Sequence, residues 1–424
     1  MLYNQSGESL IRGLQMNFRA DFHIHSKYSL GASRDMNLET LSRWAKFKGL
    51  ELLSAGDITQ PLWLSELRRK LKPQGNGLFK FNDTHFILSG EVNCVYIGMN
   101  GSRKIQLQIF SPGFEHIERI NKVLSKYGDL NSGGRPLLKL EASELVRIVC
   151  DISMDCFVVP SHIFAPGFSV LGTGGYGTFE ECFGQYAKYV FAAETGLSAD
   201  PKMCARLSCL DRITMISGSN AHMPGTIGRE ACVFNAALHY YEIKNALQYK
   251  RRDGLLYTIE FYPEEGRNYL SGHKECGTFF TPLESTNLGH VCTSCGKAVR
   301  RGVLQRVEDL SDRTVSEANG KYLPFKNVMP LDEILAFCLN AGTESQMVRD
   351  AYVKLVEKSG SEFALLLDLP EEEVRRLAPV PVAEGILKSR KSDVRIFPGY
   401  DGVPGKVILF DEGELAKYSQ LELF

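Results

Sequence analysis

The strongest constraint on the fold is an alternation of short apolar runs with helical stretches in the first half of this 424-residue chain. The apolar runs are ELLSAGD (51–57), HFILSGE (85–91), CFVVPSH (156–162) and ITMISGSNAH (213–222). Stretches with helical periodicity lie between them, among them 37–50 and 116–128. Strands that alternate with helices at this spacing predict an α/β domain with a parallel sheet or barrel.

Each of these apolar runs ends on an acidic or metal-capable side chain. The residues at these ends are Asp57, Glu91, His162, and the pair Asn220 and His222. In a parallel barrel the carboxyl ends of the strands share one face, where loops build the active site, so these side chains are expected to converge. Each one alone is more simply explained as a polar core or loop residue, but together they favour a metal centre.

Two histidines stand one residue apart in ADFHIHSKYS (20–29). Side chains at positions i and i+2 of a strand point to the same face, so His23 and His25 would lie together. Two neutral imidazoles on one face hold a transition metal or lie over a charged substrate. For this short motif alone, a surface strand with two incidental histidines is an equal alternative.

The composition narrows the class of protein. The formal net charge of −1 excludes a globally basic coat for nucleic acid but leaves room for a local basic groove. There is no apolar run long enough for a bilayer and no leader pattern, so we expect a cytoplasmic, nucleoid-associated protein without a membrane partner. In that compartment the 11 cysteines are expected to be reduced thiols, some of them metal ligands.

A second constellation has the spacing of a structural zinc site. GHKECG and HVCTSCGK place His273 and Cys276, then Cys292 and Cys295, as two short knuckles. His290 is the nearby competitor, but it lies too close to Cys292 to be the simpler fourth ligand. Glycine follows Cys276 and Cys295, as expected where the backbone turns tightly. A closed four-ligand zinc shapes a surface and performs no chemistry.

Basic runs flank this module at 249–254 (YKRRDG) and 296–306 (GKAVRRGVLQR). Such runs are usually solvated faces, but beside a phosphodiesterase-like barrel we expect contacts with a DNA backbone. Downstream, 368–394 is equally compatible with a helix-hairpin-helix and with a plain helical bundle, and 397–410 predicts a hairpin around Asp401 and Gly402.

These patterns divide the chain into predicted parts. They are an N-terminal extension (1–18), a metal-binding barrel (19–245), a zinc-binding module (246–315), a C-terminal helical domain (316–395), and a hairpin with a tail (396–424).

The sequence resembles the polymerase-and-histidinol-phosphatase (PHP) superfamily, and within it the endonuclease Q-like DNA-repair family. The matching stretches include DFHIHSKYS, PSHIFAPGFSVLG, ETGLSADPKM, RITMISGSNAHMPGTIGREACVFN and TIEFYPEEGRNYLSGHKECG. The resemblance implies a distorted (β/α)7 barrel around metal ions, with the zinc module and the helical region attached. It also implies nicking of DNA on the 5′ side of deaminated bases (uracil, hypoxanthine, xanthine) or abasic sites.

The resemblance implies roles for particular residues. The metal ligands would be His23, His25, Asp57, Glu91, His162, Asn220 and His222, holding one to three divalent ions (Zn, Mn, Fe or Mg). Of these, His23, His25, Glu91 and His222 would act in catalysis by activating water, and Lys27, Tyr28 and Arg229 would bind substrate.

The departures from the family pattern fall on the metal centre. Asn220 replaces an aspartate, Gln60 replaces a histidine, and Gln106 and Leu107 replace a histidine pair. An amide oxygen lacks the charge of a bridging carboxylate, and leucine cannot coordinate a metal. We therefore expect at least one metal site to be weakened or lost, with His23, His25, Glu91 and either His162 or His222 as the remaining core.

The last residues, QLELF, match the short motif by which bacterial repair proteins dock on the sliding clamp. The residues concerned are Gln420, Leu421, Leu423 and Phe424. Such a peptide buries its apolar groups in a preformed groove while the glutamine fixes the register. The alternative is a hydrophobic tail that packs on its own domain.

Together these features predict a metal-dependent endonuclease on damaged DNA. One alternative is a catalytically weakened lesion-binding or scaffold protein recruited by the clamp. A second alternative is a small-molecule phosphoesterase, although a small substrate needs neither the zinc module nor the helical region.

Overall fold

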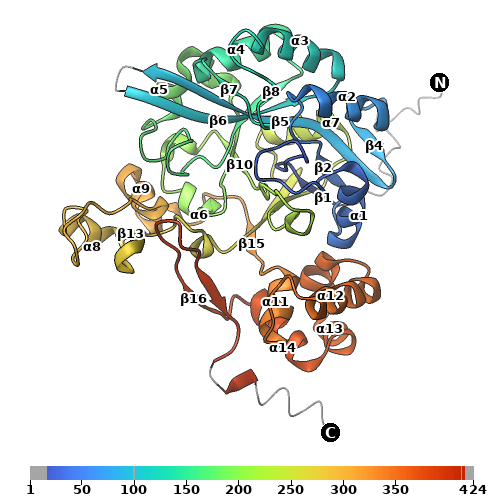
Figure 1. The fold of residues 1–424 in the computed structure, drawn as a ribbon, viewed down its shortest axis with the longest axis vertical. Helices are drawn as coiled ribbons and strands as arrows, with labels where there is room; N and C mark the ends of the chain where they lie inside the picture. The colour runs from blue at the N-terminus through green and yellow to red at the C-terminus, as the bar shows by residue number, and fades with distance from the viewer. Residues whose placement is uncertain (1–16, 99–100, 412, 416–424) are drawn as a thin grey trace, which may run out of the picture.

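A computed structural model describes residues 17–98, 101–411 and 413–415 (Figure 1). Its centre is an 11-stranded mixed sheet. The first strands are β1 (Phe18–Asp21), β2 (Leu52–Ser54), β5 (Thr84–Gly98), β6 (Gly101–Ser111) and β8 (Phe157–Pro160). β1, β2 and β5 pair in parallel, and β6 lies antiparallel between β5 and β8. The short strands β3 (Lys72–Pro73), β4 (Phe79–Phe81) and β7 (Leu137–Leu138) extend this part of the sheet.

On its other side β1 pairs antiparallel with β11 (Ala231–Phe234), which is followed by β12 (Leu255–Glu260) and β15 (Phe325–Asn327). The sheet thus extends past the predicted barrel range of 19–245, because β12 and β15 come from segments predicted to belong to the zinc module and the helical domain.

The hydrogen-bonded strands of the main sheet do not close into a complete barrel. β9 (Ala192–Glu194) and β10 (Thr214–Ile216) form a separate parallel pair. After β8, the Ile163 amide donates to the Glu194 carbonyl at 3.0 Å, and after β1 an isolated bridge joins Ile24 to Ala221. These links bring the ends of β1, β8, β9 and β10 to one side. The predicted α/β class is confirmed, in the form of a distorted and incompletely closed barrel.

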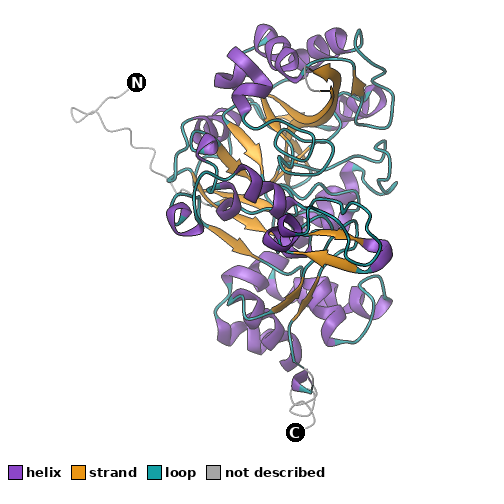
Figure 2. Cartoon of the chain, turned by 90° about the vertical axis from the view of Figure 1, so that its left-hand side faces the viewer, coloured by secondary structure: helices purple, strands orange, loops and turns teal. Residues whose placement is uncertain are grey.

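Helices flank the strands (Figure 2). Those in the barrel region are α1 (Leu38–Lys48), α2 (Pro61–Lys70), α3 (Phe114–Leu124), α4 (Ala142–Ile152), α5 (Phe179–Phe183), α6 (Pro201–Cys204) and α7 (Tyr240–Gln248). Single 3-10 turns lie at Gly184–Tyr189, Ser208–Leu210, Pro224–Thr226, Pro263–Glu265 and Lys274–Cys276. The helices predicted in 37–50 and 116–128 are both present. The first begins where the Asn37 side chain accepts from the Thr40 amide and ends at Gly49, whose φ is 82°.

One strand differs from the sequence expectation. The apolar run that ends on Glu91 was expected to be a strand end, but β5 continues to Gly98. It does so because β6 pairs with it along its outer half, from Glu91 opposite Gln108 to Gly98 opposite Gly101. Glu91 therefore projects from the middle of a long hairpin.

The later part of the chain forms two smaller units. The first contains β13 (Ser271–His273), β14 (Thr278–Phe280), α8 (Pro282–Asn287), α9 (Val303–Leu310) and α10 (Val315–Ala318). The second contains α11 (Leu331–Cys338), α12 (Gln346–Ser359), a π-helical turn (Ala364–Asp368), α13 (Glu371–Leu377) and α14 (Val380–Arg390). The predicted hairpin follows as β16 (Arg395–Phe397) and β17 (Lys406–Ile408), with Asp401 and Gly402 at φ values of 42° and 88°.

The helical unit docks on α1 through buried polar contacts. The Lys48 ammonium lies 2.7 Å from a Glu362 carboxylate oxygen, and the two side chains are 2% and 4% exposed. Trp44 packs on Tyr352 with ring centroids 5.6 Å apart. The barrel and the helical unit are therefore in direct contact at this junction. Nowhere in the described ranges does a helix have the length and apolar composition needed to cross a bilayer.

Candidate metal centre

Three predicted ligands meet in the interior of the barrel. The candidate ligand atoms of His23, His25 and Glu91 all lie within 4.8 Å of one another, and all three side chains are buried. His23 Nε2 is 3.5 Å from Glu91 Oε1, and the two imidazole centroids are 5.2 Å apart. His23 and His25 thus meet Glu91, although they follow the end of β1 at Asp21 and are not on a strand as the alternation argument assumed; the one bridge in this segment joins Ile24 to Ala221.

Two of the facing atoms lack a hydrogen-bond partner among the described residues. They are His23 Nε2 and Glu91 Oε1, and both are buried. Buried polar atoms are nearly always paired, so two unpaired lone-pair donors that face each other fit a bound cation. His162 Nε2 lies 3.6 Å from the same Glu91 oxygen and extends the set. Imidazole and carboxylate together suit Zn, Mn or Fe better than an all-oxygen Mg site.

Glu194 is a functional side chain that the sequence reasoning missed. Its two carboxylate oxygens each lie 2.9 Å from His23 Nδ1, and its side chain is 1% exposed. One oxygen also accepts from the His162 amide at 3.0 Å. A carboxylate at Nδ1 fixes the tautomer and leaves the Nε2 lone pair free for a metal. The signal was present, because Glu194 ends the apolar run of β9 in the same way that Asp57 ends the run of β2.

The charges of this cluster shift its protonation. Burial lowers the pKa of His23, but Glu194 and Glu91 outweigh it and raise the value to about 9. Burial raises the pKa of Glu91, but His23, His162 and His25 outweigh it and lower the value to about 2. Without a metal the protein therefore holds an imidazolium against a carboxylate, and a metal that binds His23 must displace a proton.

His25 is held from both sides. Its Nδ1 lies 3.0 Å from Asp57 Oδ1, and its Nε2 lies 2.9 Å from Asn220 Oδ1. The other Asp57 oxygen accepts from the amide and the hydroxyl of Ser26, each at 2.6 Å. In this arrangement Asp57 orients the His25 ring through Nδ1, and the Asn220 side chain contacts the other ring nitrogen, Nε2. Metal binding by Asp57 or Asn220 remains a prediction.

His222 lies beside this pair. Its ring centroid is 4.3 Å from that of His25, and its Nδ1 is 3.0 Å from the Asn220 carbonyl oxygen. Burial, with a smaller contribution from His25, lowers the pKa of His222 to about 4. The ring is therefore neutral at physiological pH, as a metal ligand must be.

Three of the predicted ligands have unusual backbone conformations. Asp57, His162 and Asn220 have φ values of 43°, 29° and 48°. Non-glycine residues rarely occupy this left-handed region, and they do so most often at functional sites. The strand ends are thus bent so that these side chains face the centre.

The residues that replace family histidines have separate roles. Gln106 donates from Nε2 to Glu91 Oε2 at 3.2 Å, so it positions a candidate ligand. Gln60 caps α2, where its side-chain oxygen accepts from the Trp63 amide at 2.7 Å. Leu107 is fully buried in the hydrophobic core and points to the opposite face of β6 from Gln106.

The predicted substrate-binding residues are divided between two places. Lys27 pairs with Glu66 at 2.7 Å and lies 5.4 Å from the centre of the Tyr28 ring. Arg229 donates from Nε to the Ser219 carbonyl at 2.9 Å. It also lines a cavity of about 490 Å³ whose walls include His162, Glu194 and Asn220.

The four residues of the predicted zinc site also converge. One ligand atom from each of His273, Cys276, Cys292 and Cys295 lies within 4.8 Å of the others. Hydrogen bonds from Thr278 and from nearby main-chain amides lower the pKa of Cys292 to about 6, which favours the thiolate that zinc requires.

The surroundings of this cluster agree with the sequence analysis. His290 is engaged elsewhere, since its Nδ1 lies 2.9 Å from the Ser285 hydroxyl. Gly277 and Gly296, which follow two of the cysteines, have φ values of 65° and 72°. The tight turns predicted at these glycines are confirmed.

The tail residues predicted to dock on a clamp lie outside the described part of the chain. They are Gln420, Leu421, Leu423 and Phe424. Most of the predicted N-terminal extension, residues 1–16, is likewise outside it.

Comparison with solved structures shows a match along nearly the whole chain. The lesion-specific endonuclease PfuEndoQ from Pyrococcus furiosus superposes with a TM-score of 0.84 and 28% identity, over 96% of this chain and 99% of that one. A structure of endonuclease Q in complex with a 27-mer duplex that has an abasic lesion at the active site gives 0.84 and 29% identity, over 94% and 98%.

Sequence comparisons point the same way. Residues 330–393 match the family model of the MJ0043 C-terminal domain. The uncharacterized protein YqxK of Bacillus subtilis is 25% identical over 405 residues, which is 92% of this chain and 98% of that protein. The uncharacterized protein MJ0043 of Methanocaldococcus jannaschii is 27% identical over 243 residues, 55% of this chain but 30% of that longer protein. The resemblance to endonuclease Q is therefore confirmed.

Proposed function

Since this chain has the architecture of endonuclease Q over almost its whole length, we propose that it is a metal-dependent endonuclease that nicks DNA on the 5′ side of a damaged nucleotide. The proposed lesions are deaminated bases (uracil, hypoxanthine or xanthine) and abasic sites. The single observation that supports this most strongly is the pair of buried, unpaired ligand atoms, His23 Nε2 and Glu91 Oε1, at 3.5 Å.

The chemistry of this site requires no protein nucleophile. His23, His25 and Glu91 would hold a divalent ion, which would supply the Lewis acidity for activating water and for stabilising charge on a phosphate. The protein's own contribution is to hold the ligands. Glu194 keeps the His23 proton at Nδ1, and Gln106 fixes one oxygen of Glu91. Both restraints are buried, so water does not compete for them.

The cavity beside the centre suits a nucleotide taken out of the duplex. Its volume of about 490 Å³ falls in the range of small-ligand pockets. Arg229 and Arg267 line it as cations for a phosphate, and Phe261 lines it as an aromatic surface for a base. Enzymes that act beside a damaged base extrude it into a pocket of this kind.

The proposal is tested with labelled duplexes that contain uracil, hypoxanthine or an abasic site, beside an undamaged duplex. The metal-reconstituted protein is expected to nick only the damaged strands, and a chelator is expected to abolish the reaction. His23→Ala and Glu91→Ala should be inactive. His116→Ala removes a histidine on α3 outside both metal clusters and should cleave like the wild type. Equal cleavage of undamaged DNA would contradict lesion specificity.

One observation favours a second candidate, a lesion-binding scaffold with a weakened centre. Asn220 places a neutral amide 2.9 Å from His25 Nε2, at a position where the resemblance implies a carboxylate. Under the nuclease proposal, Asn220→Asp should raise the cleavage rate. Tight binding of damaged duplex, with no cleavage by either form in Mn, Zn or Mg, would favour the scaffold. Turnover of a small phosphomonoester without any DNA cleavage would instead favour a phosphoesterase.

We also infer that the terminal QLELF docks on a bacterial-type sliding clamp. Clamp docking would raise the local concentration at DNA of a protein whose net charge is −1. In a calorimetric titration with the clamp, deletion of residues 420–424 should abolish binding. Equal binding by both forms, or binding by neither, would reject this partner.

A further inference from the structure

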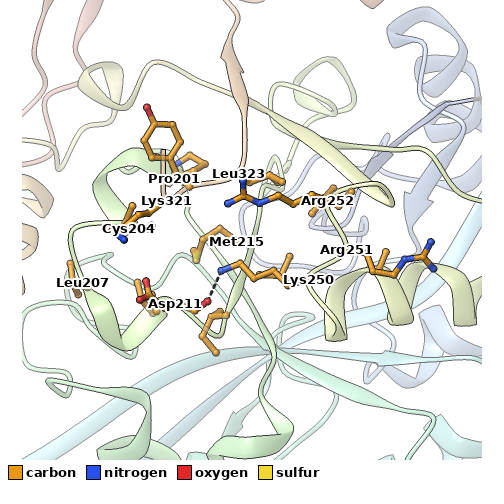
Figure 3. A pocket seen from close by; sticks show the side chains of 17 residues that line it. Pro201, Cys204, Leu207, Asp211, Met215, Lys250, Arg251, Arg252, Lys321 and Leu323 are labelled. Atoms are coloured by element: carbon orange, nitrogen blue, oxygen red, sulfur yellow. Dashed lines mark hydrogen bonds between the residues drawn. The ribbon is translucent and has the colours of Figure 1, made fainter. Parts of the chain in front are cut away.

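A second pocket, drawn in Figure 3, shares no lining residue with the cavity beside the metal centre. Ile213, Leu255 and Leu323 line it, and they stand at or just before the starts of β10, β12 and β15. Asn220 and His222 follow the other end of β10. None of the residues that line this pocket is a candidate metal ligand, so it is a separate site.

The pocket has an apolar floor and a cationic rim. Leu207, Ile213, Met215 and Leu255 are buried and form part of the floor. Lys250, Arg251, Arg252 and Lys321 are the basic residues that line it. Figure 3 shows Lys250 and Arg252 reaching toward the middle of the pocket, whereas Arg251 turns away from it. Arg251 pairs with Asp253 at 3.1 Å.

The other basic residues of the lining, Lys250, Arg252 and Lys321, have no carboxylate partner among the described residues. Asp211 is the one acidic residue in the lining, and its carboxylate is already bound by Arg313 at 2.7 Å. The Lys250 ammonium donates to the main-chain carbonyl of Asp211 at 2.6 Å, and burial lowers the pKa of Lys250. Within the described ranges, neither Arg252 nor Lys321 forms an ion pair.

Stabilisation of the C-terminal end of α7 explains only part of this cluster of basic residues. Cations after a helix stabilise its C-terminal dipole, and Lys250 to Arg252 follow the end of α7. Lys321 comes from another segment, between α10 and β15, and it lines the same pocket. Positive charge thus converges from two segments of the chain on one small cavity.

The size and surroundings of the pocket define the ligand. Its cavity volume is about 30 Å³, room for about two water-sized groups and too little for a nucleobase, and the pocket is partly open to solvent. Asp253 pairs with Arg251, and Asp312 accepts from the Ser208 amide at 2.8 Å, so neither carboxylate neutralises Arg252 or Lys321. We propose that Lys250, Arg252 and Lys321 bind the phosphate group of a small molecule in this pocket. The expectation that the run 249–254 contacts DNA stays a prediction, and the test below distinguishes it from this proposal.

The test is equilibrium dialysis of labelled inorganic phosphate against the full-length, metal-loaded protein. The wild type is expected to show saturable binding, and Arg252→Gln/Lys321→Gln should weaken it at least about tenfold, since each removes a charge-assisted hydrogen bond. Arg119→Gln/Lys139→Gln removes two exposed, unpaired cations elsewhere and should leave binding unchanged. Glu91→Gln, in the metal centre, should also retain it.

Two results would overturn the proposal. The first is loss of phosphate binding in Glu91→Gln with full binding in Arg252→Gln/Lys321→Gln, which would place the phosphate at the metal centre alone. The second is unchanged phosphate binding together with weaker binding of undamaged duplex in Arg252→Gln/Lys321→Gln, which would make these cations a DNA surface. Thermal unfolding without phosphate checks that the variants fold. If the double variant does not, Lys250→Met serves as the second variant with the same expected loss.

Discussion

Replacing Glu194 with glutamine tests the part of the centre that the tertiary structure alone revealed. The carboxylate contacts His23 Nδ1 through both oxygens at 2.9 Å and is 1% exposed. Glutamine keeps the shape and one acceptor but removes the charge. The ring is then less firmly oriented, and its Nε2 becomes a weaker ligand.

The expected magnitude follows from the protonation of His23. Its pKa is about 9 against the usual 6.5, a difference worth about 3 kcal/mol, and Glu194 is the largest contributor that raises it. Loss of an outer carboxylate of this kind typically costs about 10–100-fold in metal affinity, or about 1.4–2.7 kcal/mol. We expect Glu194→Gln to fall in this range at the barrel metal site.

The pH dependence separates this role from a merely structural one. In the wild type a proton competes with the metal for His23 below about pH 9, so affinity should rise from neutral pH to that value. In Glu194→Gln the pKa of His23 is lower and the proton competes less. The rise should therefore be shallower, and the deficit in affinity should be larger near pH 9 than near pH 7.

The assay is metal titration at several pH values, followed by single-turnover cleavage of an abasic duplex at saturating metal. Glu230→Gln is the matched control, because Glu230 is also buried at 1% exposure but has no hydrogen bond to His23. The argument fails if Glu194→Gln binds metal like the wild type at every pH, or if Glu230→Gln shows the same deficit.

Other parts of the structure give further predictions. Cys292→Ala should cost one tightly bound zinc and lower the melting temperature, and full zinc content by elemental analysis would reject the structural site. Lys48→Met leaves Glu362 buried without its counter-ion, although the Tyr352 hydroxyl and the Leu331 amide still donate to it, and should cost about 3 kcal/mol in urea unfolding. Adding Glu362→Gln should restore part of this loss, and strictly additive losses would contradict the pairing. Burial raises the pKa of Asp200 to about 6, so its contribution to stability is full below pH 3.8 and is lost as the pH rises through 6. Asp200→Asn, which still caps α6, should therefore stabilise the protein by about 1–3 kcal/mol near pH 8 and have little effect near pH 4. A larger gain near pH 4 would contradict this sign.

Local sequence patterns determined several features of this protein. The alternation of apolar runs and helical stretches predicts an α/β fold, because the spacing of apolar residues in each segment favours either a strand or a helix. The HxH spacing brings both imidazoles to one site, in the short segment that follows β1. The His273 and Cys276 knuckle meets Cys292 and Cys295 because glycines at positive φ turn the chain directly after two of the cysteines. All of these depend on residues close together in the chain.

The tertiary structure decided which distant side chains meet. Glu194 reaches His23 across 171 positions of sequence, because the β9–β10 pair and the bridge between Ile24 and Ala221 bring the two segments together. Asp57 and Asn220 both end apolar runs, yet they lie on the two ring nitrogens of His25 rather than on one common point. Arg251 and Arg252 are neighbouring arginines, but Arg251 pairs with Asp253, whereas Arg252 faces the pocket proposed to bind phosphate. Sequence specifies which residue types are available, whereas the direction of each Cα–Cβ bond and the packing of distant strands decide what each side chain touches.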